Sequence, residues 1–233
     1  MKIADLYPTP NELDEGWRNW AAAGLVGAGL AAASAPAQSS PPAIQQLVAL
    51  SPHHAPQATQ MRVRPVTNHP HELVLLNAAR AQRMPEMEIA QFMAQARHET
   101  ENFTRLTERG SLRDFQKYDP KHNPAKARIL GNRAEGDGAR YRGRGYLHIT
   151  GRYWYTLIGQ AIGVDLERNP QLMANPDIAA RASLWYWNNR VRPRVADATN
   201  TRQVTRRIHP GFRALPERQR YFDEYRASMR AGR

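Results

Sequence analysis

The chain has 233 residues, with 33 Lys and Arg against 21 Asp and Glu and no cysteine, which gives a formal net charge of +12. This length suits one substantial domain with an appendage, and the missing cysteines exclude disulfides and a thiolate nucleophile. The charge is uneven, because residues 61–233 carry 31 basic and 17 acidic groups, a net charge of +14. This part should attract polyanions such as nucleic acid, acidic lipid or an anionic cell wall.

The first 68 residues differ in composition from the rest of the chain. Residues 1–38 contain a weakly apolar Ala/Gly run, for which a packaging tail, a signal peptide and a membrane anchor are all open interpretations. Residues 39–68 are rich in Pro, Gln and His, as is typical of a flexible linker. The histidines near this linker show no zinc-binding spacing, so we expect no metal and no cofactor. The main domain is expected over residues 69–233.

Helix signals follow one another from residue 71 onward. The segments with helical apolar spacing or with capping residues are 71–83, 84–99, 123–131, 150–163, 175–189, 201–208 and 216–230. Pro85 stands at a first-turn position of the second segment, and glycines end the third and fourth segments. Only residues 141–150 look extended, with Gly143 and Gly145 as turn residues. We therefore predict an all-α domain with one minor β-hairpin, formally α+β.

Two acidic residues nine positions apart suggest catalysis. Glu99 lies about 20° from Phe92 around the axis of the second helix, on its apolar face, where a carboxyl group loses solvation and holds its proton to higher pH. That property suits a general acid. Glu108 would lie about 13 Å further along a continuous helix, but Asn102 and Gly110 predict a bend that turns it toward Glu99. Two carboxyls about 6.5–9.5 Å apart give the inverting geometry for cleaving a glycosidic bond. Ion pairs with nearby arginines are the structural alternative.

Four segments occur in a recognisable order, and the first of them contains Glu99. The segments His98–Thr100, Gly143–Gly145 and His148–Gly151, together with the closing stretch 204–222, resemble glycoside hydrolase family 19, which includes chitinases and many phage endolysins. The likeness spans about residues 73–225 and implies a lysozyme-like helical domain with an active-site groove. It also implies Glu99 as general acid, Glu108 as general base and Thr150 as the residue that positions the attacking water.

The same resemblance implies a set of substrate-binding residues, which are Tyr141, Arg144, His148, Tyr155 and His209. Three positions depart from the family pattern, because His148 replaces a Gln while Trp154 and His209 each replace an Asn. These departures affect the chitin-type subsites rather than the acid–base pair. Trp154 fits core packing instead, together with Trp185 and Trp187.

The basic domain matches peptidoglycan, which carries negative charge, whereas neutral chitin gives no reason for this charge. We therefore expect a peptidoglycan-degrading glycoside hydrolase, an endolysin or virion-associated lysin of the muramidase type that inverts configuration. It would act as a monomer on the cell wall in the periplasm, after synthesis in the host cytoplasm, with residues 1–38 in contact with a virion or membrane.

Other functions stay open at this point. A chitinase is one alternative, and a non-catalytic basic virion protein that binds nucleic acid or glycan is another, although no recognised nucleic-acid motif is present. The phage-lysozyme family fits less well, because Asp114 and Phe115 occupy the place of its threonine.

Overall fold

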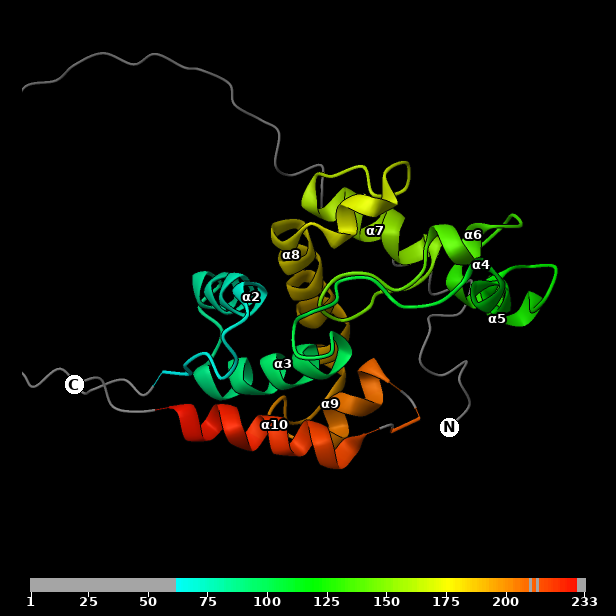
Figure 1. Ribbon diagram of the computed structural model, residues 1–233. Coiled ribbons are helices and arrows are strands. Elements are labelled where there is room, and N and C mark those ends of the chain that lie inside the picture. The colour runs from blue at the N-terminus through cyan, green and yellow to red at the C-terminus, as the bar shows by residue number, and fades with distance from the viewer. Residues whose placement is uncertain (1–61, 210, 213, 230–233) are drawn as a thin grey trace, which may run out of the picture. The chain divides into compact units, whose positions relative to one another are not determined.

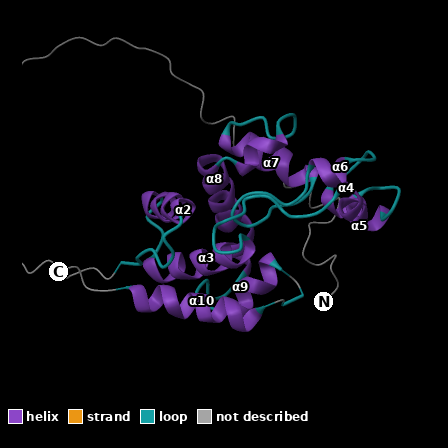
Figure 2. Ribbon diagram, viewed as in Figure 1, coloured by secondary structure: helices purple, strands orange, loops and turns teal. Residues whose placement is uncertain are grey.

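The computed structural model describes residues 62–209, 211–212 and 214–229, which form helices joined by loops (Figures 1 and 2). The α-helices of these residues are α2 (Pro70–Ala81), α3 (Glu86–Glu99), α4 (Leu112–Phe115), α5 (Pro124–Leu130), α6 (Asp137–Arg140), α7 (Arg152–Ile162), α8 (Pro176–Tyr186), α9 (Thr201–Ile208) and α10 (Leu215–Ser228). The same residues form three 3₁₀ helices, which are η2 (Gln116–Tyr118), η3 (Pro170–Ala174) and η5 (Arg192–Arg194). They also form one π-helix, η4 (Trp187–Val191).

Residues 1–38 and most of the predicted linker lie outside the described ranges. Within those ranges, no helix combines the length and the apolar character needed to cross a bilayer.

The seven predicted helical segments each contain a helix, and capping residues explain where several of them begin and end. The Asn123 side chain accepts from the backbone N–H of Lys126 at 3.0 Å to start α5, and Asn175 caps α8 in the same way. Gly131 and Gly163 follow α5 and α7 with φ of 68° and 70°, the left-handed conformation that stops a helix. These local signals confirm the predicted all-α class.

The predicted β-hairpin over residues 141–150 does not form. Arg144 makes two isolated bridges, to Thr107 and to Ile149, and the described residues contain no β-sheet. Gly145 and His148 have φ of 76° and 44°, and these left-handed residues turn the backbone before a ladder can extend. The segment around Thr107 and the segment around Arg144 nevertheless run side by side away from α3 (Figure 1).

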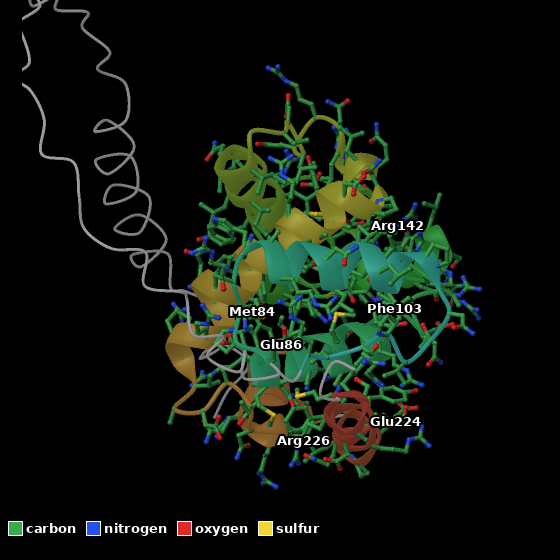
Figure 3. All side chains as sticks on the ribbon, turned by 90° about the vertical axis from the view of Figure 1, so that its left-hand side faces the viewer. Met84, Glu86, Phe103, Arg142, Glu224 and Arg226 are labelled. Atoms are coloured by element: carbon green, nitrogen blue, oxygen red, sulfur yellow. The ribbon has the colours of Figure 1, made fainter. Side chains whose placement is uncertain are left out.

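Helix α3 runs through the core of the domain. Residues 88–96 are all buried, and Ile89 and Phe92 have no exposed surface. Helix α10 lies along α3, and α2 also packs against it (Figure 1). Arg97 of α3 pairs with Glu224 of α10 at 2.5 Å, and Figure 3 shows Glu224 on α10. A helix covered in this way needs internal partners for each of its polar side chains.

The tryptophans pack as predicted. Trp154 and Trp187 are 2% and 0% exposed, and Trp185 is partly buried against the same core. The Trp187 indole N–H donates to the buried carboxylate of Glu88 at 2.5 Å, which provides one of the internal partners that α3 requires.

The described end of the predicted linker belongs to the folded domain. Val63 is fully buried, and the buried carboxylate of Glu72 accepts from the Thr67 N–H at 2.8 Å and from the Tyr225 hydroxyl at 2.5 Å. Through Glu72, residues 62–68 are joined to α2, and α2 is joined to α10. The domain therefore begins before the predicted boundary. The amino-acid composition of residues 62–68 did not predict this packing, because backbone groups make much of the contact.

Candidate active site

Glu99 is the last residue of α3, and the chain reverses directly after it. The buried Thr100 hydroxyl accepts from the Phe103 N–H at 3.0 Å. Residues 101–103 have φ of 50°, 61° and 67°, a left-handed conformation that costs L-residues about 1–2 kcal/mol each. Such strain persists only where the surrounding structure holds it. The predicted bend before Glu108 is thus a sharp reversal of the chain.

Glu99 does not have the apolar surroundings that its helical position predicts. Its side chain is 13% exposed, and its Oε1 accepts from the guanidinium of Arg218 at 2.5 Å. Arg218 belongs to α10 and is 1% exposed, so the pair lies largely inside the protein. Helical periodicity correctly places Glu99 on the inner face of α3, but it carries no information about the cation that α10 brings there.

A second pair lies beside the first. The His98 ring lies 2.6 Å from the Glu217 carboxylate, joining α3 to α10 again. Burial and the charge of Arg218 lower the pKa of His98, and they outweigh the opposing effects of Glu99 and Glu217. Burial alone would raise the pKa of Glu217, but hydrogen bonds from Tyr221 and His98 lower it. Two consecutive residues of α3 therefore hold two consecutive residues of α10.

The loop over residues 141–151 closes against Glu108. The Gly143 N–H donates to Glu108 Oε2 at 3.0 Å, and the Glu108 N–H donates back to the Gly143 carbonyl at 2.8 Å. The Tyr118 hydroxyl donates to Oε1 at 3.2 Å, and Lys117 Nζ lies 3.8 Å from the same oxygen. A Cβ on residue 143 would lie only 3.1 Å from Oε2, so glycine permits this close approach. Gly143, predicted as a turn residue, thus also leaves room for a carboxylate.

His148 and Thr150 adjoin Glu108 through the same glycine. A Cβ on residue 143 would also lie 3.1 Å from the Cβ of His148, and the Thr150 hydroxyl donates to the His148 carbonyl at 2.9 Å. His148 Nε2 lies 3.3 Å from the Arg105 carbonyl oxygen. The structure thus brings His148 of this loop close to Glu108 and links Thr150 to His148 by a hydrogen bond.

Three of the predicted substrate-binding residues are buried, two of them on this loop and one on α7. Tyr141, Arg144 and Tyr155 are 1%, 6% and 0% exposed. Arg144 donates to the Tyr155 hydroxyl at 2.9 Å, and that hydroxyl donates to the Arg142 carbonyl at 2.6 Å. Burial raises the pKa of Tyr155 to about 12, so its hydroxyl remains a donor. Because protein groups occupy these polar atoms, we reassign the three residues from substrate contact to support of the loop.

His209 lies at the end of α9 rather than on the loop that contacts Glu108. Its N–H donates to the Thr205 carbonyl at 2.7 Å, and α9 packs against α10. Its buried ring Nδ1 has no hydrogen-bond partner among the described residues. The structure therefore associates His209 with α9 and with α10, the helix that carries Arg218.

A surface hollow of about 530 Å³ lies where α9 and α10 begin. Asn200, Arg202 and Phe222 contribute to its lining, and neither Glu99 nor Glu108 does. We therefore do not assign the substrate groove to this hollow.

Arg218 was not among the site residues predicted from the sequence. It lies in the closing stretch 204–222 that carries part of the family resemblance, but Arg220 also precedes Tyr221 and Phe222 there, so the sequence did not single Arg218 out.

Comparison with known proteins identifies similar chains. The family model described as class I chitinase, of glycoside hydrolase family 19, matches residues 73–206, a range that includes Glu99, Glu108 and Thr150. A glycosyl hydrolase family 19 domain-containing protein of Haemophilus influenzae is 33% identical over 166 residues, which cover 62% of this chain and 80% of that protein. Endochitinase At2g43590 of Arabidopsis thaliana is 36% identical over 115 residues, but the chain spans only 40% of its length.

A solved structure shares the fold. Chitinase C from Streptomyces griseus HUT6037 superposes with a TM-score of 0.51 and 21% sequence identity, over 67% of this chain and 82% of that chain. This likeness supports the helix-rich architecture alone.

Proposed function

Because this chain belongs to glycoside hydrolase family 19 and is a glycoside hydrolase, we propose that it cleaves the glycan strands of bacterial peptidoglycan. The observation that carries the choice of substrate is charge, since residues 61–233 have a net charge of +14. Peptidoglycan stems and their associated polymers are anionic, so a basic enzyme is attracted to them over long distances.

In the proposed reaction, Glu99 protonates the leaving glycosidic oxygen and Glu108 takes a proton from the attacking water. Once Glu99 has given up its proton, the charge of Arg218 stabilises the carboxylate that remains. The partners of Glu108 include Gly143 and Tyr118 as donors, which match the lone pairs of an ionised carboxylate.

Thr150 positions the water in this proposal. Its hydroxyl is anchored to the His148 carbonyl at 2.9 Å, so the side chain has a defined orientation. Attack by water from the face opposite the leaving group inverts the configuration of the anomeric carbon.

Chitin is the second candidate substrate. The observation in its favour is that the Arabidopsis thaliana relative is an endochitinase.

The substrate test compares purified sacculi with chitin oligosaccharides. We expect soluble muropeptides whose mass spectra show new N-acetylmuramic acid reducing ends, and proton NMR should show the inverted anomer first. Release of fragments from chitin oligosaccharides alone would contradict the choice of peptidoglycan and favour the second candidate.

The catalytic assignment is tested by Glu99→Gln and Glu108→Gln. Each amide keeps the size of the side chain but removes acid–base chemistry, so we expect kcat/KM to fall by about 10²- to 10⁴-fold. Glu101→Gln is the matched control, since Glu101 lies in the same stretch, is 53% exposed and pairs with Arg105 and Arg109. Full activity of a folded Glu99→Gln variant would reject the assignment.

A further inference from the structure

A buried row of polar side chains links α3, α9 and α10. Gln91 and Gln95 of α3 are both 0% exposed, and Thr201 and Thr205 of α9 are 4% and 0% exposed. The Thr201 hydroxyl donates to Gln91 Oε1 at 3.1 Å, and Gln95 Nε2 donates to the Thr205 hydroxyl at 3.2 Å. The row therefore consists of two Gln–Thr pairs, separated by one turn on each helix.

Gln95 also contacts Arg218. Its Oε1 accepts from Arg218 Nη1 at 2.6 Å, while Nη2 of the same guanidinium donates to Glu99 Oε1 at 2.5 Å. A guanidinium is planar and only donates hydrogen bonds, so two acceptors one helical turn apart define its orientation. Because Arg218 is 1% exposed, bulk water is not available to replace a lost acceptor.

Both ends of the Gln95 amide are in use. The carbonyl oxygen faces Arg218 and the amide nitrogen faces Thr205, so rotation of the amide would break both hydrogen bonds. Gln95 is fully buried, so a glycan cannot contact it. Arg218 is the residue that bonds both Gln95 and Glu99, and it links the amide to the proposed acid.

We propose that Gln95 is a positioning residue, which holds Arg218 in the orientation that places the carboxyl group of Glu99 for catalysis. This inference rests on the proposed role of Glu99 as general acid. It predicts that removing the Gln95 amide changes the rate of the chemical step but not substrate binding.

The variant Gln95→Met tests this inference, because methionine has a similar length without hydrogen-bonding groups. We expect kcat on sacculi to fall by about 10- to 100-fold with KM nearly unchanged, since the misplaced group is in the acid rather than in the binding surface.

Gln91→Met is the matched control. Gln91 lies one turn earlier on α3, is equally buried and bonds a threonine of the same helix α9, but its hydrogen bond goes to Thr201 rather than to Arg218. We expect a smaller loss of Tm, because Gln91 Nε2 already lacks a hydrogen-bond partner among the described residues, and we expect kcat and KM within about twofold of the wild type.

A milder variant serves if Gln95→Met does not fold, as judged by circular dichroism. Thr205→Val removes only the hydroxyl that accepts from the Gln95 amide, and it should give a smaller fall in kcat with KM nearly unchanged. Equal kcat values in the Gln95, Thr205 and Gln91 variants would overturn the inference, yet the proposed function would stand if Glu99→Gln were inactive. A wild type that cleaves neither sacculi nor chitin would instead overturn the proposed function, and the inference with it.

Discussion

The position of the Glu108 carboxylate depends on the absence of one side chain. In Gly143→Ala the new methyl carbon would lie 3.1 Å from Glu108 Oε2 and from the His148 carbonyl oxygen, closer than ordinary contact. The carboxylate or the loop must then move, so we expect kcat/KM on sacculi to fall by about 10- to 100-fold. Steady-state kinetics on the folded variant measure this change.

A glycine outside the site provides the control for that change. Gly136 has φ of 88°, and no atom lies within 4 Å of the point that an alanine methyl carbon would occupy, so alanine there introduces backbone strain without a contact. We expect Gly136→Ala to lower the free energy of unfolding by about 1 kcal/mol or more and to leave kcat/KM unchanged. Wild-type activity in Gly143→Ala would show that the glycine does not determine the carboxylate position.

At the scale of elements, the contact between α3 and α10 depends on pH. The pKa of His98 is lowered below 6.5, so around that pH the unfolded chain binds more protons, and stability is lost as pH falls. The pKa of Glu217 is lowered below 4.5, so its contribution is present above that pH and is lost on further acidification. Both pKa shifts therefore predict that Tm falls as the pH is lowered from about 7 to about 4, which circular dichroism can measure.

The variant His98→Gln tests whether His98 causes the part of this pH dependence that lies near neutral pH. Without the titrating ring, the slope of Tm against pH between about pH 7 and pH 5 should become smaller. His122→Gln is the control, because His122 is exposed in the loop before α5. An unchanged slope in His98→Gln would contradict the assignment.

At the scale of the whole molecule, charge predicts salt-sensitive binding. The Debye length falls from about 10 Å at 0.1 M to about 3 Å at 1 M, which screens the field of a chain with a net charge of +12. We expect the Kd for sacculi in a pelleting assay to rise steeply with NaCl. Hydrolysis of neutral chitin oligosaccharides should change little over the same range, and a salt-independent Kd for sacculi would contradict the charge argument.

Local sequence determined the helices and the class of the fold. The capping residues Asn123 and Asn175 and the terminal glycines 131 and 163 act within a few residues, because helical hydrogen bonds connect groups only four positions apart. The ordered motifs around Glu99 and residues 141–151 also indicated the family. The sharp reversal after Glu99 was expected only as a bend, since its left-handed residues are not glycines.

Tertiary packing decided the environment of the site. Arg218 meets Glu99 across 119 positions of sequence, and spacing along α3 describes only one of the two helices that make this pair. The same limit explains Tyr141 and Tyr155, whose burial depends on the elements packed over them. A periodic pattern shows which face of a helix turns inward, but the partner it meets there is set by the packing of distant segments.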